Sequence, residues 1–316
     1  MVYWLLRSAT WLIRWIPSTP RQAIGGLLCQ AVYWGWPEKR RNTIDNMAHV
    51  LGRPATDRQV RRLARRSWRN YGRYVADFLN FPNITGQQLL AHLEDQTPFE
   101  GGWPQVTRTA LARGKGVLVV TAHFGNWDVA GSLFASYFTF SAIAETFKDP
   151  RLNDLIQSQR LQKGMQIIPM EGSGTRKVLR ALHQSEIVAI LVDRPLTAKD
   201  GVPITFFGQT TYVPGGPAAL ALKTGAAIVP GFAWYADTPR GAFHTTVWEP
   251  IIAEPEPGKS QEERIRNLTQ RIYDAIEAII RAHPDQWFMF RAFWPPTPTA
   301  TPETSPEPLP LEARSL

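Results

Sequence analysis

A short apolar run that leads into a histidine-containing turn is the segment that most restricts the fold of this chain. Residues 117–120 are β-branched or leucine and carry no charge, which predicts a strand buried on both faces. The sequence TAHFGNWD follows at 121–128, and Asp128 opens a run suited to a helix. On one continuous helix, His123 and Asp128 would splay about 140° apart. At a strand–turn–helix junction their side chains can converge instead.

A histidine and a carboxylate that converge can act as a general base. A carboxylate bonded to one ring nitrogen fixes the imidazole tautomer and leaves the other nitrogen free to take a proton from a hydroxyl. His123 and Asp128 also lie at the carboxyl end of a predicted central strand, where open α/β sheets bind their ligands. A histidine near an aspartate is more often a surface pair or a local hydrogen bond, so the motif alone leaves both interpretations open.

Strands and helices alternate through the middle of the chain. Helices are predicted at 106–113, 127–137, 151–163, 175–183, 217–223 and 262–283, and strands at 116–121, 140–144, 166–169, 187–192, 226–232 and 243–248. This alternation predicts an α/β fold whose central sheet is mostly parallel and flanked by helices on both faces. The last segment, 295–316, is rich in proline, threonine, glutamate and serine and is predicted to be disordered.

Residues 1–36 have the composition of a membrane-associating helical segment. They contain five tryptophans: Trp4, Trp11, Trp15, Trp34 and Trp36. Tryptophan favours the headgroup layer of a bilayer, and Arg7 and Arg14 lie one heptad apart on an otherwise apolar helix, as in helices that lie in the interface. The second apolar stretch, 22–36, would be about 22 Å long as a helix, shorter than the hydrocarbon core of about 30 Å. We expect shallow anchoring, with a helical hairpin packed on the domain as the alternative.

The chain is basic, with a formal net charge of +8 over 316 residues. Arginines recur through a predicted helix that begins near Asp57, with apolar residues between them at helical spacing. We expect this cationic face to contact anionic lipids, with a solvated charged face as the alternative. Nucleic acid is not an expected partner, because no binding motif accompanies the arginines. The single cysteine, Cys29, excludes a disulfide framework and a multi-cysteine zinc site.

An ordered set of segments resembles a known family. TAHFGNWD at 121–128 is followed by Lys148 and Arg160, and then by LVDR at 191–194, GVPITFFG at 201–208, GPAALA at 216–221 and HPDQWFMF at 283–290. Over residues 1–295 the chain resembles the lipid A biosynthesis (lauroyl/myristoyl) acyltransferases of the lysophospholipid acyltransferase superfamily, which include phosphatidylinositol mannoside acyltransferases. The resemblance implies a glycerolipid acyltransferase-like domain at 37–294 on the cytoplasmic face of the bacterial inner membrane.

The resemblance also implies an activity. The protein would be an O-acyltransferase that moves a fatty acyl group from acyl-CoA or acyl-carrier protein to a hydroxyl of a glycolipid or lysophospholipid. His123 would be the general base, Asp128 its orienting partner, and Arg160 a contact to the oxyanion or to a phosphate. Further substrate contacts are expected from Gly125, Asn126, Lys148, Asp193, Arg194, Phe206, Phe207 and Gly208. Neither a metal ion nor a cofactor is expected, because the acyl donor is itself a substrate.

The chain departs from the family pattern after Asp193-Arg194. Many relatives have another acidic residue there, where this chain has Pro195; we expect Asp193 itself or Asp200 to replace it. Two other classes of function stay open: a hydrolase that activates water on a thioester or phosphoester with the same pair, and a basic membrane-binding protein with a degenerate site. The intact histidine–aspartate motif argues against the latter. The acceptor and the acyl-chain length do not follow from the sequence.

Overall fold

The computed structural model describes residues 2–236 and 242–295. A seven-stranded sheet in the order β1-β9-β8-β2-β5-β3-β4 forms its centre. The tail predicted to be disordered lies outside the described residues from position 296 onward. The strands of the sheet are β1 (Leu93–Asp95), β2 (Val117–Thr121), β3 (Phe140–Ala144), β4 (Gln166–Pro169), β5 (Ile187–Leu191), β8 (Ala227–Tyr235) and β9 (Phe243–Val247).

The predicted α/β fold with a mostly parallel central sheet is confirmed. Strands β8, β2, β5, β3 and β4 pair in parallel. The exceptions lie at one edge, where β9 is antiparallel to β8, and β1 is parallel to β9. A separate antiparallel hairpin, β6 (Val202–Phe206) and β7 (Gln209–Val213), carries the predicted GVPITFFG segment.

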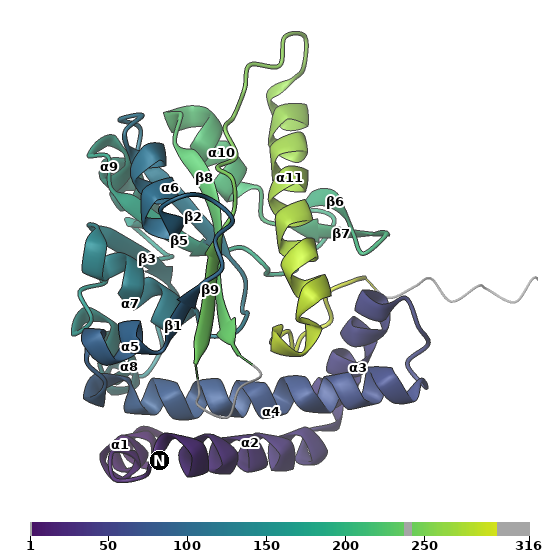
Figure 1. Ribbon diagram of the computed structural model, residues 1–316. Coiled ribbons are helices and arrows are strands. Elements are labelled where there is room, and N and C mark those ends of the chain that lie inside the picture. Colours follow the sequence, from purple (N-terminus) through teal and green to yellow (C-terminus); the bar gives the residue numbers. More distant parts are fainter. Residues whose placement is uncertain (1, 237–241, 296–316) are drawn as a thin grey trace, which may run out of the picture.

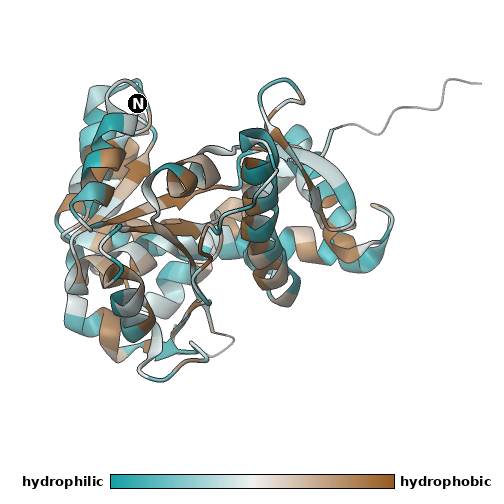
Figure 2. Cartoon of the chain, turned by 90° about the horizontal axis from the view of Figure 1, so that it is seen from above, coloured by the Kyte–Doolittle hydropathy of each residue, from teal (hydrophilic) through white to brown (hydrophobic). Residues whose placement is uncertain are grey.

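Helices cover both faces of the sheet (Figure 1). One face packs against α6 (Gly102–Leu111) and α7 (Trp127–Tyr137), and the other against α9 (Gly174–His183), α10 (Gly216–Thr224) and α11 (Gln261–Ala282). The sequence of β2 is apolar throughout because both of its faces are buried. Val117 and Val119 join the core under α6 and α7, whereas Leu118 and Val120 join the core on the opposite face of the sheet. Figure 2 shows the apolar colouring concentrated on the strands between the helices.

The N-terminal helices form a separate layer. Figure 1 shows the long helix α4 (Arg58–Asn80) beneath the sheet, with α1 (Val2–Ile13) and α2 (Ser18–Gly35) below it. Helix α3 (Pro37–Leu51) joins α2 to α4, and Asp57 caps the N-terminus of α4 with a side chain that accepts a 2.6 Å bond from the Gln59 amide. None of the described helices combines the length and the apolar character that crossing a membrane requires.

The remaining elements are short. A 3₁₀ turn, η1 (Phe81–Asn83), and helix α5 (Gly86–Ala91) connect α4 to β1, and helix α8 (Pro150–Leu161) packs against β4 at the far edge of the sheet. A second 3₁₀ turn, η2 (Pro284–Gln286), follows α11 and packs against α4. It brings the segment 284–290 to the carboxyl end of β2.

Helices α2 and α4 touch where two glycines face each other. A Cβ atom at Gly25 would overlap the carbonyl oxygen of Gly72, and a Cβ atom at Gly72 would overlap that of Gly25. Four residues before Gly25, Arg21 forms a buried ion pair with Asp77 of α4, 3.4 Å between Nη2 and Oδ1. Backbone contact and a buried charge pair therefore fix α2 to the domain.

Substituting Gly72→Ala is expected to destabilise the protein by about 1–3 kcal/mol, because the added methyl group meets backbone that cannot rotate away. The measurement is thermal or denaturant unfolding of the full chain. Gly35→Ala is the matched control, since a Cβ atom at that helical position meets nothing within 4 Å. Equal stability of the two variants would contradict the close crossing.

Candidate active site

The turn that carries His123 is held by main-chain hydrogen bonds. The amide of Gly125 donates to the carbonyl of Gln286 at 2.8 Å, and that of Asn126 to the carbonyl of Ala233 at 2.9 Å. Gly125 has a φ of +57°, and a Cβ atom there would overlap the Ala233 carbonyl oxygen. Glycine is the residue that permits both the backbone conformation and the close approach to β8.

A carboxylate holds the imidazole of His123. His123 Nδ1 lies 2.8 Å from Asp193 Oδ1, and the His123 amide donates to Asp193 Oδ2 at 2.9 Å. The indole Nε1 of Trp287 donates to the same Oδ2 at 2.9 Å. Asp193 is fully buried, so these three donors satisfy a carboxylate that water does not reach.

Strand register explains why Asp193 is the partner. Thr121, the last residue of β2, lies opposite Leu191, the last residue of β5. Two residues further along each parallel strand, His123 and Asp193 are therefore level with each other. They are 70 positions apart in the chain, and no local spacing connects them.

The pair alters the pKa values of both side chains. Burial by itself lowers the pKa of His123, but the charge and hydrogen bond of Asp193 outweigh it and raise that pKa above its ordinary value. Burial raises the pKa of Asp193, and the pairing with His123 brings it below its ordinary value. An ionised carboxylate only accepts, so the proton of the neutral imidazole sits on Nδ1 and leaves Nε2 as a base.

The sequence-based expectation that Asp128 orients His123 is corrected by these contacts. Asp128 is buried in the first turn of α7, where its Oδ1 accepts from Arg160 Nε at 2.7 Å and its Oδ2 from the Tyr74 hydroxyl at 2.8 Å. Asp128 lies on α7 and bonds to Arg160 and Tyr74, whereas the Nδ1 atom of His123 is bonded to Asp193. A catalytic role for Asp128 itself stays a prediction.

Arg160 forms a second buried ion pair close to the first. Burial lowers the pKa of Arg160, but the charge of Asp128 outweighs it and raises that pKa. The guanidinium also donates through Nη2 to Asp128 Oδ2 at 3.4 Å and through Nη1 to Gln157 at 3.4 Å. Arg160 is thus held in its charged form by Asp128, and its role in binding substrate stays a prediction.

Two cavities meet at His123. The inner chamber, of about 230 Å³, lies between α7 and the sheet, and its walls include Val119, Gly131, Phe134, Phe140, Ala142 and Met165. The outer groove, of about 610 Å³, lies along α4, and its walls include Leu6, Tyr71, Phe78, Phe147, Phe288 and Arg291. His123, Trp127, Arg160 and Arg194 line both cavities. The His123 side chain is 40% exposed, so molecules in either cavity can reach it.

The other predicted substrate contacts fall into two groups. Arg194 lines both cavities and pairs with Glu145 at 2.9 Å, whereas Lys148 is exposed in the loop after β3 and lines neither cavity. Phe206, Phe207 and Gly208 lie on the β6–β7 hairpin, outside the walls of both cavities. Phe206 packs against Trp287, with 6.1 Å between ring centroids, so the hairpin supports the indole that holds Asp193.

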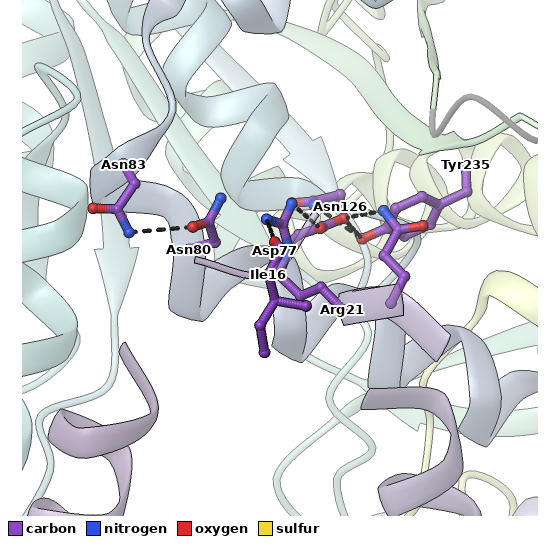
Figure 3. Close-up of polar contacts among 8 residues, drawn as sticks. Ile16, Arg21, Asp77, Asn80, Asn83, Asn126 and Tyr235 are labelled. Atoms are coloured by element: carbon purple, nitrogen blue, oxygen red, sulfur yellow. Dashed lines mark hydrogen bonds and ion pairs between the residues drawn. The ribbon is translucent and has the colours of Figure 1, made fainter. Parts of the chain in front are cut away.

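Asn126 is buried and belongs to a network of hydrogen-bonded polar side chains. Its Oδ1 accepts from the Val129 amide at 3.1 Å and caps α7, and its Nδ2 donates to the Tyr235 hydroxyl at 3.1 Å. That hydroxyl donates to Asp77 at 2.9 Å. Figure 3 shows Asp77 between Tyr235 and Arg21, which connects α2 to the turn after His123. A direct contact of Gly125 or Asn126 with substrate stays a prediction.

Several residues of the site were not singled out from the sequence. Tyr74 belongs to the amphipathic helix that begins near Asp57. The spacing of the apolar residues in that helix predicted packing, and it gave no sign that Tyr74 donates a hydrogen bond to Asp128. Trp287 lies within the HPDQWFMF segment. That segment contributed to the family resemblance, but the sequence assigned no role to the indole.

In residues 2–236 and 242–295, no group of three or more histidine, cysteine, aspartate or glutamate side chains is arranged to hold a metal ion.

Comparisons with known proteins agree on one family. A family model described as bacterial lipid A biosynthesis acyltransferase matches residues 1–295. The chain is 30% identical to the phosphatidylinositol mannoside acyltransferase of Mycolicibacterium smegmatis over 91% of this chain and 90% of that protein. It is 32% identical to the phosphatidylinositol mannoside acyltransferase of Mycobacterium tuberculosis over 82% of this chain and 78% of that protein.

Substituting Asp193→Asn is expected to lower the pKa of His123, because it removes the charge that raises this pKa and keeps the burial that lowers it. The measurement is a titration of the His123 imidazole followed by NMR. Asp200→Asn is the matched control, since Asp200 is an exposed carboxylate that accepts a bond from Thr197. An unchanged His123 titration in Asp193→Asn would contradict the pairing.

Proposed function

The chain belongs to the bacterial lipid A biosynthesis acyltransferase family, and from this premise we propose that His123 is the general base of acyl transfer to a glycolipid hydroxyl. The protein is an acyltransferase of the lipid A or phosphatidylinositol mannoside type, which requires an acyl donor and a glycolipid acceptor. The observation that carries the proposal is the position of His123, where two cavities meet, with Nδ1 held by a buried carboxylate.

The proposed reaction needs one proton carrier and no enzyme nucleophile. His123 Nε2 takes the proton from an acceptor hydroxyl, and the oxygen attacks the carbonyl carbon of a thioester donor, either acyl-CoA or acyl-carrier protein. A tetrahedral oxyanion forms; as it collapses, the carbon–sulfur bond breaks and the thiolate leaves. The imidazolium returns its proton to the sulfur, and the product is an ester. Asp193 stabilises the imidazolium between the two transfers.

The two cavities suit the two substrates. The inner chamber is lined mainly by apolar side chains, so it suits the acyl chain of the donor. The outer groove has four cationic residues in its walls: Lys39, Arg160, Arg194 and Arg291. Guanidinium groups bind phosphate oxygens with paired donors, so this groove suits the phosphates of the donor or of a phospholipid-linked acceptor. Arg160 lies at the junction, where a tetrahedral oxyanion also develops.

The N-terminal layer suits a membrane surface. Large apolar side chains of α1, α2 and the turn between them are exposed, among them Trp4, Trp11 and Trp15, with 57–71% of their surfaces in contact with solvent. The Arg14 guanidinium lies 4.9 Å from the ring centroid of Trp15, and such pairs of a cation and an aromatic ring suit the headgroup layer of a bilayer. Leu6 of α1 also lines the outer groove. A lipid acceptor could therefore enter the groove from the membrane side.

Substituting His123→Ala is expected to reduce acyl transfer by about 10²–10⁴-fold, because the reaction loses its general base; thermal unfolding is measured alongside, because the variant also removes a partner of the buried Asp193. The measurement is the initial rate of ester formation on phosphatidylinositol mannoside with acyl-CoA or acyl-carrier protein as donor. His92→Ala is the matched control, since His92 is exposed and its ring bonds locally to the Gln88 carbonyl.

Near-normal transfer by His123→Ala would refute the assignment of the base. The same assay, run without acceptor, separates transfer from hydrolysis. Thioester loss that proceeds equally well without a lipid acceptor would instead support a hydrolase.

Replacing Trp4, Trp11 and Trp15 together by glutamine is expected to weaken binding to anionic vesicles by at least about tenfold, because three apolar side chains no longer enter the interface. The measurement is co-sedimentation of the full chain with phosphatidylglycerol vesicles. Phe99→Gln is the control, since Phe99 is 39% exposed and lies outside α1 and α2. Unchanged sedimentation of the triple variant would exclude this surface as the docking face.

A further inference from the structure

We propose that Gly131 and Met165 form the floor of the inner chamber and set the length of the acyl chain that the enzyme transfers. The inference rests on the proposed function, since it assigns the inner chamber to the acyl group of the donor. It adds a determinant of chain length, which neither the motif residues nor the names of the relatives supply.

Strand register gives the depth of the chamber. Phe140 at the start of β3 pairs with Ile187 of β5, which in turn pairs with Val117 of β2. Val117 precedes His123 by six residues, so at about 3.3 Å per residue the level of Phe140 lies about 20 Å below the imidazole. Met165 directly precedes β4, whose first residue pairs with the neighbour of Phe140. Both side chains line the chamber, which places its floor far from the reacting atoms.

Several wall positions above this floor carry small residues, between larger side chains such as Val119 and Phe134. Ala142, Ala189 and Gly231 line the chamber from the sheet, and Ala130 and Gly131 line it from α7. Protein interiors are close-packed, so large side chains at these positions would fill the space between helix and sheet. The chamber is instead an open space with mostly apolar walls that continues to His123. An extended alkyl chain, with its carbonyl at the imidazole, fits this shape.

A methyl group added at Gly131 would crowd the side chains of Met165 and Phe140. Gly131 lies in the middle of α7, where glycine destabilises a helix by about 0.5–1 kcal/mol relative to alanine. A Cβ atom at this position would lie 2.7 Å from Met165 Sδ and 3.5 Å from Phe140 Cε1. The thioether belongs to a flexible, buried side chain, so alanine at position 131 can be accommodated if Met165 moves. The floor of the chamber is thus set by the contact between these two residues.

The test is a competition among acyl donors. Full-length protein receives an equimolar mixture of lauroyl-, myristoyl-, palmitoyl- and stearoyl-CoA, or the matching acyl-carrier proteins, with phosphatidylinositol mannoside as acceptor, and mass spectrometry gives the products. Gly131→Ala is expected to shift the products toward shorter chains and Met165→Ala toward longer ones. The ratio of neighbouring chain lengths is expected to change by about tenfold, since one methylene in an apolar pocket changes relative rates by about 10–200-fold.

Two controls separate chain selection from stability. Met47→Ala removes the same side chain from a fully buried position outside the chamber, so it is expected to leave the product profile unchanged. Gly131→Ala keeps the test decisive if Met165→Ala does not fold, because alanine favours the helix. Variants that transfer acyl groups with an unchanged profile, or a profile shift in Met47→Ala, would overturn the inference. Absence of transfer by the unmodified protein from either donor set would instead refute the proposed function.

Discussion

The parallel pairing of β2 with β5 is the constraint on which the site depends. It sets the two strand ends level, so that His123 and Asp193 follow them side by side. The same carboxylate accepts from the His123 amide and from the indole of Trp287. A shift of the register would separate all three partners and leave a buried charge without compensation, which is costly in a protein interior. The strand pairing therefore fixes both the fold and the orientation of the His123 imidazole.

Two buried ion pairs hold different side chains of the site. Asp193 holds the imidazole and raises its pKa, whereas Asp128 holds the Arg160 guanidinium together with the Tyr74 hydroxyl. Asp128 also lies in the first turn of α7, where the helix dipole favours a negative charge. The histidine and the aspartate of the motif are thus close in sequence but have different partners. Both residues line the inner chamber, and His123 also lines the outer groove.

Periodicity predicted the elements of the domain and left their contacts open. The predicted strands at 116–121 and 187–192 correspond to β2 and β5, and the predicted helix at 262–283 corresponds to α11. Strand β1, only three residues long, was not predicted, because its position depends on pairing with β9 rather than on its own sequence. The crossing of α2 over α4 at Gly25 and Gly72 was also not predicted, since two isolated glycines carry no signal until the helices meet.

The sequence by itself determined the fold class and the family, because these follow from local periodicity and from the order of motifs along the chain; it also predicted His123 as the reactive group. Only the tertiary structure decided which carboxylate holds that histidine and which residues enclose the inner chamber. The physical reason is distance along the chain: Asp193 reaches His123 through strand register across 70 residues, and the inner chamber is bounded by residues of α7 and of four different strands. Such contacts arise only when separate elements pack together, and no local pattern encodes them.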